Sequence, residues 1–318
     1  MGRVLIPQAV APEGVAFLEE RGHEVVQGSG ADVETIVREV SGCDAILART
    51  ASFPAAVLEA EPALRVIARH GVGYDNIDVA RASELEIQVT FTPEANAGSV
   101  AEMTIALMLA ITRNLVRADA ALRAGDFAIR NRELGVDLIG KTLLVVGVGR
   151  IGRLVAQKAH DGLGMRVLGF DPAPAANLPG YVALAAGLDE ALTRADVVSL
   201  HLPSTPETKG SFDATRLSHV KREAYLVNCA RGDIVNEADL AGALREGQIA
   251  GAALDVFADE PPAPDHPFFT LPNVIVTPHI AALTRECVIR MAMDAAKGID
   301  DVLAGRPPRW PVNRPGSG

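Results

Sequence analysis

The sequence predicts an α/β protein with two doubly wound parallel-sheet domains, one inserted into the other. Apolar strand-like runs alternate with helical patterns along the chain, as in βαβ units. A G-x-G-x-x-G motif follows one of these strands and opens a helix. This motif normally opens its domain, yet about 140 residues precede it here. A complete α/β unit must therefore come first.

Length, charge and cysteine content set further limits. A chain of 318 residues is too long for one ordinary core, so two domains are expected. The net charge is −10 and no run of Lys and Arg forms a basic stripe, which argues against nucleic acid as a partner. Three scattered cysteines without C-x-x-C spacing argue against disulfides and a zinc site, and indicate a reducing compartment.

The sequence contains no pattern typical of a leader peptide or a membrane anchor. The N-terminus lacks a long apolar h-region and is broken by proline and glycine. The longest apolar helical stretch, 103–112, is flanked by charged residues and is too short to cross a bilayer. We expect a soluble, cytoplasmic protein with no membrane partner.

The expected elements follow one another in regular alternation. In the first part of the chain, strands are expected at 3–8, 23–28, 44–49 and 64–71, and helices at 12–22, 32–42 and 55–62. Later strands are expected within 141–146, 165–171, 195–203, 224–233, 249–262 and 273–280. Strand and helix taking turns at this spacing predict mostly parallel sheets.

Two longer helices are expected as well. One runs from about 97 to 124 and is apolar on most of its circumference, which predicts burial inside a domain or against a second subunit. The other runs from about 283 to 303 and could return the chain to the first domain. The proline-rich tail after residue 305 is expected to lie extended.

The glycine motif predicts a dinucleotide site. Gly147 provides the tight turn, Gly149 lets a pyrophosphate approach the backbone, and Gly152 lets the helix pack on the strand. The next strand ends at Asp171, about 20 residues on, where a carboxylate accepts hydrogen bonds from a ribose. The structural alternative is a glycine-rich turn without a ligand, but the strand, the helix and Asp171 all favour a dinucleotide site.

Asp171 also indicates which dinucleotide binds. A carboxylate at this position repels a 2′-phosphate, and the segment 172–181 contains no Arg or Lys to neutralise one. NAD is therefore expected rather than NADP.

Polar residues follow the later strands at their carboxyl ends, where ligands bind in open α/β sheets. Arg231, Asp255, Glu260 and His279 are expected to converge there. A guanidinium can clamp a carboxylate, an imidazole can transfer a proton, and a carboxylate behind it can fix its tautomer. This set suits hydride chemistry on an α-keto acid.

Each of these residues also has a structural interpretation. Arg231 could be a surface residue, Glu260 part of a solvated acidic pair, and His279 a packed or capping histidine. Their common place at strand ends after a cofactor motif favours the catalytic interpretation. The histidines show no ligand spacing, so no metal site is expected.

Six segments in order resemble the D-2-hydroxyacid dehydrogenases, in wording closest to the phosphoglycerate dehydrogenase branch. They are RHGVGYDNIDV (69–79), FTPEANAGSVAEMT (91–104), GVGRIG (147–152), NCARGDIVNE (228–237), GAALDVFADEPP (251–262) and NVIVTPHIAALT (273–284). The resemblance implies a Rossmann-type NAD domain, 97–284, inserted into a flavodoxin-like substrate domain formed by 1–96 and 285–318. It also implies a homodimer formed through the long helix of the NAD domain.

The resemblance assigns roles to individual residues. It implies that the catalytic residues are Arg231, Glu260 and His279. The cofactor residues it implies are Gly147, Gly149, Arg150, Ile151, Gly152, Asp171, Leu202, Pro203, Thr208, Cys229, Ala230, Asp255 and Ala281. The implied substrate residues are Val72 and Gly73 through their amides, Asn96 beside them, Arg231, and Arg69 as a candidate for a second acidic group.

The chain departs from the usual pattern of that branch in two places. Asp233 stands where glycine is usual, and Ala281–Ala282 replaces a glycine-containing pair. His70 could touch the substrate or be a packed loop residue, and Arg49 or Arg69 could bind a phosphate. Phosphoglycerate, glycerate or hydroxypyruvate, lactate-type acids and sulfonated analogues all remain candidate substrates.

Two other functions stay open at this point. One is a formate- or phosphite-type dehydrogenase with the same catalytic set. The other is an NAD-sensing, corepressor-like binding protein.

Overall fold

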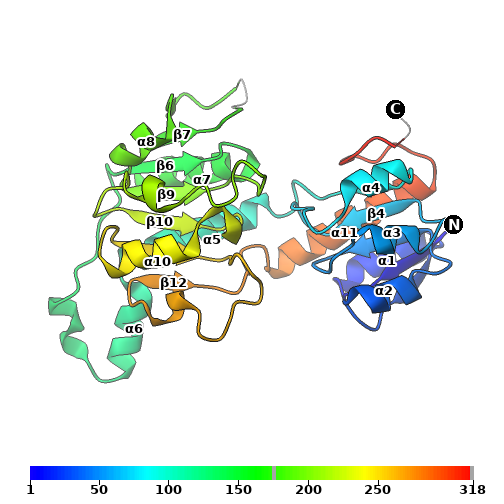
Figure 1. Cartoon of the computed structure of the whole chain (residues 1–318), viewed down its shortest axis with the longest axis horizontal. Helices are drawn as coiled ribbons and strands as arrows, with labels where there is room; N and C mark the ends of the chain where they lie inside the picture. Colours follow the sequence, from blue (N-terminus) through cyan, green and yellow to red (C-terminus); the bar gives the residue numbers. More distant parts are fainter. Residues whose placement is uncertain (174–176, 316–318) are drawn as a thin grey trace. The chain divides into compact units, whose positions relative to one another are not determined.

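The computed structural model describes residues 1–173 and 177–315, which form two compact α/β units (Figure 1). One unit comprises Met1–Asn96 and the segment from Leu283 onward, and the other comprises Ala97–Ala282. The return to the first unit thus begins two residues before the expected position, 285. All strand pairs within the two sheets are parallel, which confirms the predicted fold class.

The first unit contains a five-stranded sheet in the order β2-β1-β3-β4-β5, the flavodoxin-like order. Its strands are β1 (Arg3–Ile6), β2 (Glu24–Gln27), β3 (Ala45–Ala48), β4 (Val66–Arg69) and β5 (Gln88–Thr90). Its helices are α1 (Pro12–Glu20), α2 (Val33–Glu39), α3 (Ala55–Glu59), α4 (Val79–Glu84) and α11 (Arg285–Leu303). Apolar clusters cover both faces, one beneath α1 and α11 and the other beneath α2, α3 and α4.

The second unit contains a seven-stranded sheet in the order β12-β11-β10-β9-β6-β7-β8, a Rossmann arrangement with one added strand. Its strands are β6 (Thr142–Val146), β7 (Arg166–Phe170), β8 (Val182–Leu184), β9 (Val197–Leu200), β10 (Tyr225–Asn228), β11 (Gly251–Leu254) and β12 (Val274–Val276). Its α-helices are α5 (Ala97–Thr112), α6 (Leu115–Arg123), α7 (Arg150–Leu163), α8 (Leu188–Arg194), α9 (Ala214–Leu217) and α10 (Glu237–Arg245). Short 3-10 turns lie at η1 (Phe127–Asn131), η2 (Gly232–Ile234) and η3 (Pro267–Thr270).

The helix expected from 97 to 124 is two helices, so that prediction was wrong. The chain leaves α5 after Thr112, adopts a left-handed conformation at Asn114 (φ 52°), and enters α6 at an angle of 60°. Helix α5 is largely buried against α7 and the sheet, whereas α6 buries none of its residues. Among the described residues no single helix is long and apolar enough to cross a membrane, and only this bent pair reaches that composition jointly.

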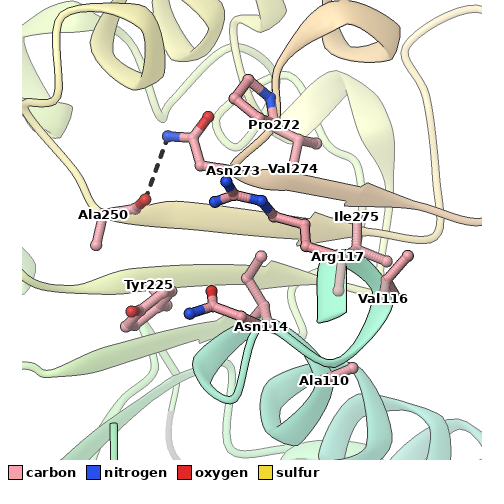
Figure 2. A pocket seen from close by; sticks show the side chains of 11 residues that line it. Ala110, Asn114, Val116, Arg117, Tyr225, Ala250, Pro272, Asn273, Val274 and Ile275 are labelled. Atoms are coloured by element: carbon pink, nitrogen blue, oxygen red, sulfur yellow. Dashed lines mark hydrogen bonds between the residues drawn. The ribbon is translucent and has the colours of Figure 1, made fainter. Parts of the chain in front are cut away.

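A groove lies beside the break between α5 and α6 (Figure 2). Its walls come from both helices and from β10 to β12, including Ile111, Val116 and Val274. The Asn273 side chain fixes one end of the groove by donating to the Ala250 carbonyl at 3.2 Å. The exposed apolar side chains Leu115, Leu122 and Phe127 follow along the same segment.

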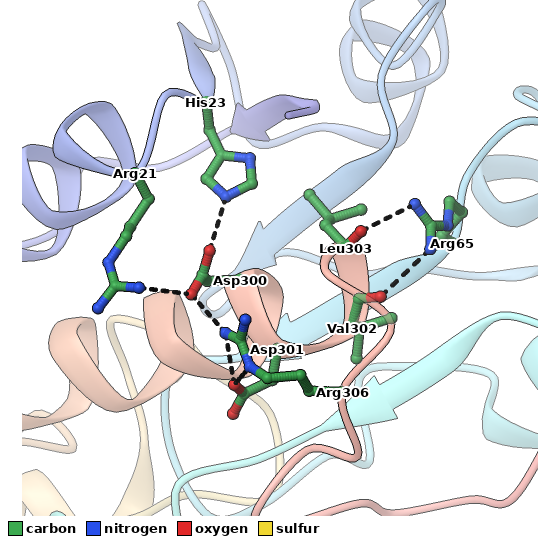
Figure 3. Close-up of polar contacts among 8 residues, drawn as sticks. All are labelled: Arg21, His23, Arg65, Asp300, Asp301, Val302, Leu303 and Arg306. Atoms are coloured by element: carbon green, nitrogen blue, oxygen red, sulfur yellow. Dashed lines mark hydrogen bonds and ion pairs between the residues drawn. The ribbon is translucent and has the colours of Figure 1, made fainter.

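The C-terminal helix joins the first unit through a buried carboxylate (Figure 3). Asp300 Oδ1 lies 3.2 Å from His23 Nε2, and Asp300 Oδ2 accepts from Arg306 Nη2 at 2.7 Å. Arg21 lies 3.6 Å from the same oxygen. Burial acts to raise the pKa of Asp300, but the hydrogen bonds from His23 and Arg306 and the charges of both arginines outweigh it and lower the pKa.

We expect Asp300→Asn to lower the free energy of unfolding by about 2 kcal/mol at pH 7, because charge-assisted hydrogen bonds are lost. A lowered pKa gives stability above the ordinary value of 3.8 that is lost as the pH falls below it. The difference between variant and wild type should therefore shrink below about pH 4. Urea unfolding of variant and wild type at pH 7 and below about pH 4 measures this difference in the free energy of unfolding.

Asp301→Asn is the matched control, because Asp301 is more exposed and bonds only to Arg306 within the contacts described. It should cost less than about 0.5 kcal/mol. Equal effects of the two substitutions would contradict the role assigned to Asp300.

Candidate active site

The glycine turn after β6 has the backbone geometry of a phosphate cradle. Gly147 has φ 97°, and a Cβ there would lie 2.7 Å from the His201 carbonyl carbon. A Cβ at Gly152 would lie 2.0 Å from the Gly147 oxygen, so α7 packs directly on the turn. Gly149 is the N-cap of α7, and among the described residues no atom lies within 4 Å of a Cβ placed there. The N–H groups of this helix start are thus available to an anion, and the turn fits a dinucleotide.

Asp171 stands at the carboxyl end of β7, beside the glycine turn. Its Oδ2 accepts the Val148 N–H at 2.9 Å and its Oδ1 accepts the Ala173 N–H at 2.9 Å. Both hydrogen bonds orient the carboxylate beside the turn. Residues 174–176 of the segment without Arg or Lys lie outside the described residues.

His279 and Glu260 form the central polar pair of the larger unit. His279 Nδ1 lies 2.7 Å from Glu260 Oε2, and both side chains are partly exposed. The ionised carboxylate accepts the Nδ1 proton, which fixes the tautomer and leaves Nε2 as the nitrogen for exchange with a ligand. The backbone of His279 adopts φ 53°, an uncommon conformation for a residue with a side chain.

The charge of Glu260 is set by its neighbours. Partial burial acts to raise the pKa of Glu260, but His279, the Phe257 N–H and the charge of Arg231 together lower it. The carboxylate is therefore ionised at neutral pH. Arg231 donates from Nη1 to the Ala230 carbonyl at 2.7 Å. Arg231 follows β10, Glu260 follows β11 and His279 follows β12, so all three come after the carboxyl ends of neighbouring strands.

Asp255 holds the turn that carries His279. This residue is fully buried, and its Oδ1 accepts the Thr277 hydroxyl at 2.5 Å and the Ile280 N–H at 2.9 Å. Its Oδ2 accepts the Ala281 N–H at 2.8 Å, and its carbonyl accepts the His279 N–H at 2.8 Å. The resemblance implies contact with a nicotinamide carboxamide; in the structure the carboxylate organises residues 277–281.

The expected cofactor segment 202–208 is held by hydrogen bonds of the Thr208 side chain to its own backbone. Thr208 Oγ1 donates to the Pro203 carbonyl at 2.6 Å and accepts the Thr205 N–H at 2.8 Å. Leu202 and Cys229 are buried, and burial raises the pKa of Cys229 to about 12, so this thiol is protonated. Arg150 is exposed in the first turn of α7 and Ile151 is half-buried beside it.

Asp233, the departure from the usual glycine, contacts the same segment. Its Oδ2 accepts the Ser204 hydroxyl at 2.7 Å, while Lys209 Nζ lies 4.0 Å away. Asp233 Oδ1 is buried and accepts no hydrogen bond among the described residues.

The substrate residues predicted in the first unit lie at the end of β4 and beyond. Arg69 donates from Nε to the Gly73 carbonyl at 2.6 Å and from Nη1 to the His70 carbonyl, so its guanidinium shapes the loop 70–73. His70 is buried with Nε2 3.3 Å from the Val288 carbonyl, and burial lowers its pKa to about 4. His70 is therefore a neutral, packed residue. Arg49 donates to the Ala9 carbonyl at 3.2 Å.

Asn96, the last residue of the first segment, is buried, and its Oδ1 accepts no hydrogen bond among the described residues. Within 1–173 and 177–315, no group of three or more His, Cys, Asp or Glu could hold a metal ion.

Comparison with known proteins identifies the family. Residues 105–281 match the model for the NAD-binding domain of D-isomer specific 2-hydroxyacid dehydrogenases. The chain belongs to this family. A D-3-phosphoglycerate dehydrogenase from Methanocaldococcus jannaschii is 39% identical over 99% of this chain and 60% of its own length. The chain thus spans about three fifths of that relative.

Two other relatives match along their whole length. A glyoxylate reductase from Korarchaeum cryptofilum is 37% identical over 98% of this chain and 96% of its own length. The crystal structure of the TT0316 protein from Thermus thermophilus superposes with a TM-score of 0.91, at 39% identity, covering 98% of this chain and all of that one.

The structure also reveals residues that sequence reasoning about a D-2-hydroxyacid dehydrogenase missed. Asn228 is buried, donates to the Arg231 carbonyl at 2.9 Å and accepts the Ala230 N–H at 2.9 Å. Its side chain thus stabilises the turn 228–231, called the arginine turn below. Glu237 accepts the Ala258 N–H at 2.9 Å in the segment before Glu260. Asn228 could have been noticed in the sequence as a polar residue at the end of the apolar strand YLVN.

Asp255→Asn should lower the free energy of unfolding by about 2 kcal/mol, because an amide nitrogen would face the N–H of Ile280 or Ala281. The rates of hydrogen exchange at the Ile280 and Ala281 amides should increase as well. Thermal melting and amide exchange measure the effect, and Asp259→Asn, at an exposed position of the following loop, is the control. Unchanged protection at both amides would contradict this account of the turn.

Proposed function

We propose that the chain is an NAD-dependent oxidoreductase that transfers a hydride between nicotinamide and a small D-2-hydroxy acid or 2-keto acid. The observation that carries the proposal is the His279–Glu260 hydrogen bond of 2.7 Å, in the unit that also contains the glycine turn. The matched relatives are dehydrogenases and reductases of this kind. They favour this function over a formate- or phosphite-type dehydrogenase and over an NAD-sensing corepressor.

His279 is the proposed acid and base. Its Nδ1 is bound to Glu260, so Nε2 gives a proton to the carbonyl oxygen of a keto acid and removes it from the hydroxyl of a hydroxy acid. The ionised Glu260 stabilises the imidazolium state in which the proton is given. Arg231 supplies a planar guanidinium, which can clamp the substrate carboxylate or polarise its carbonyl.

The residues of the glycine turn and Asp171 are proposed to hold NAD. Bound NAD supplies the hydride acceptor for oxidation, and its reduced form supplies the hydride for reduction. The Gly147–Gly152 backbone is proposed to receive the pyrophosphate and Asp171 the ribose hydroxyls. Leu202, Pro203, Ala230 and Ala281 are proposed to line the same site.

Substrate recognition in the first unit stays a proposal from the sequence. The amides of Val72 and Gly73 are proposed to bind the substrate carboxylate, with Asn96 beside them. The guanidinium contacts of Arg69 with loop carbonyls support a role in shaping this loop. The candidate substrates include 3-phosphoglycerate, glycerate, hydroxypyruvate, glyoxylate and lactate-type acids. NADH formation or consumption across such a panel tests the proposed function directly.

A homodimer formed through the NAD-binding unit is proposed as well. Helix α6 buries none of its residues, and the groove beside it in Figure 2 is lined by apolar residues such as Val116 and Ile275 together with polar ones such as Asn114 and Arg117. Exposed apolar residues on α6 and the following segment favour a protein partner over solvent. A second copy of the chain would cover this surface.

His279→Gln should reduce kcat on the best substrate by a factor on the order of 10² to 10⁴, because no group replaces the proton transfer. NADH affinity, followed by its fluorescence, should stay unchanged. His219→Gln, at an exposed position, is the control and should keep full activity. Wild-type turnover by the His279 variant would refute the proposed role.

Val116→Glu should shift the protein from two chains to one in sedimentation equilibrium, because Val116 is 53% exposed and lines the groove. Leu184→Glu, which places the same charge on an equally exposed apolar residue of β8, should leave the mass unchanged. A dimer that survives the Val116 substitution would place the interface elsewhere.

A further inference from the structure

Two carboxylates bind neighbouring peptide groups in the segment that leads to Glu260. The Phe257 N–H donates to Glu260 Oε1 at 3.2 Å, and the next amide, Ala258 N–H, donates to Glu237 Oε1 at 2.9 Å. Glu237 is the first residue of α10, while Glu260 makes the contact with His279. Glu237 therefore holds the 257–258 peptide, and the adjoining 256–257 peptide binds Glu260.

The same segment lies directly against the arginine turn. A Cβ at Gly232 would lie 1.9 Å from the Phe257 carbonyl carbon and 2.4 Å from the Ala258 nitrogen, so only glycine allows this approach. Gly232 follows Arg231 and begins the 3-10 turn that leads toward α10. Residues 231–237 thus touch the 257–258 peptide at one end and bind it through Glu237 at the other.

Glu237 is itself fixed by a histidine. His266 Nε2 lies 3.1 Å from Glu237 Oε2, and their side chains are 11% and 21% exposed. His266 Nδ1 faces the Phe268 N–H at 3.4 Å and accepts from it, so Nε2 is the nitrogen that donates to Glu237. The imidazole also packs edge-on against Phe257, with ring centroids 5.3 Å apart.

We propose that Glu237 and His266 are positioning residues that set the orientation of Glu260 against His279. The inference rests on the proposed function, since it assigns these residues to the proton-transfer pair. In the order of contacts, His266 orients Glu237, Glu237 orients the 257–258 peptide, and this segment orients Glu260.

The charge of Glu260 gives the arrangement a measurable consequence. The groups that face this carboxylate are His279, the Phe257 N–H and the charge of Arg231, and together they outweigh its burial and lower its pKa. Glu237 holds the 257–258 peptide through the Ala258 N–H, and the adjoining 256–257 peptide carries the Phe257 N–H that Glu260 accepts. If loss of the Glu237 contact lets this segment shift, the Phe257 N–H contact weakens and the pKa of Glu260 rises. Because Glu260 must be ionised to act, the acid limb of the pH profile then moves to higher pH.

Glu237→Gln tests the first contact. The amide keeps the shape of the side chain and the acceptor for Ala258, but its NH₂ group opposes His266 Nε2–H. Titration of the Glu260 side-chain carboxyl by ¹³C NMR, assigned with Glu260→Gln, should show a midpoint at higher pH than in wild type. The acid limb of kcat/KM should move the same way, kcat should fall on the order of tenfold or more, and KM for NADH should change less than about twofold.

Substitutions of His266 separate its two nitrogens. Asparagine can reach the Nδ1 position and accept the Phe268 N–H, but it is too short to reach Glu237. Glutamine can reach the Nε2 position and donate to Glu237. His266→Asn should therefore shift the Glu260 titration, while His266→Gln should restore much of the wild-type midpoint.

Glu246→Gln is the matched control, because it removes a carboxylate from the exposed C-cap of the same helix. It should leave the titration and the pH profile unchanged. An unshifted Glu260 titration in folded Glu237→Gln and His266→Asn proteins would overturn the inference, as would equal shifts in the control. The NMR titration needs no substrate, so a wild-type protein inactive on every 2-hydroxy acid would sink the proposed function and leave this test intact.

Discussion

The position of His279 against Glu260 depends on the buried carboxylate of Asp255. A carboxylate with no exposed surface is stable only if hydrogen bonds replace its water, and here three come from the segment 277–281. These bonds stabilise the left-handed backbone of His279 and direct its imidazole to Glu260. The position of the histidine therefore follows from satisfying a buried charge at the end of the neighbouring strand, β11.

The alternation of strands and helices could be predicted from the sequence because each buried parallel strand is a short apolar run. The short edge strand β8 went unnoticed: it has three residues, of which Ala183 and Leu184 are exposed. The break between α5 and α6 was also missed, because RNLVR contains neither Gly nor Pro and continues a helical pattern. The left-handed conformation at Asn114 depends on tertiary contacts, such as its side-chain bond to the Leu134 carbonyl at 3.2 Å.

The site residues fall into two groups by how far they could be predicted. Arg231, Glu260 and His279 were proposed as site residues because polar residues at the carboxyl ends of parallel strands meet at one edge of a sheet. A carboxylate behind the imidazole was expected, and Glu260 reaches His279 across 19 residues of sequence. The contacts that hold this pair depend on loop conformation and were not predicted. Arg69 was predicted from its place beside a ligand loop, and the structure adds that its guanidinium donates to the carbonyls of that loop, which the sequence did not indicate.

Two glycines bring the backbones of different loops into direct contact. Gly147 lies against the His201 carbonyl, and Gly232 lies against the 257–258 peptide, so each joins two strand-end loops without a side chain between them. Such contacts transmit small displacements, because peptide groups are stiff and cannot change rotamer as a side chain does. At the second of these contacts Glu237 accepts the Ala258 N–H, and in the neighbouring loop Asp255 accepts the Ala281 N–H. The geometry of the proposed site thus depends on acids that bind backbone amides, the buried Asp255 and the half-buried Glu237, as much as on the residues assigned to the chemistry.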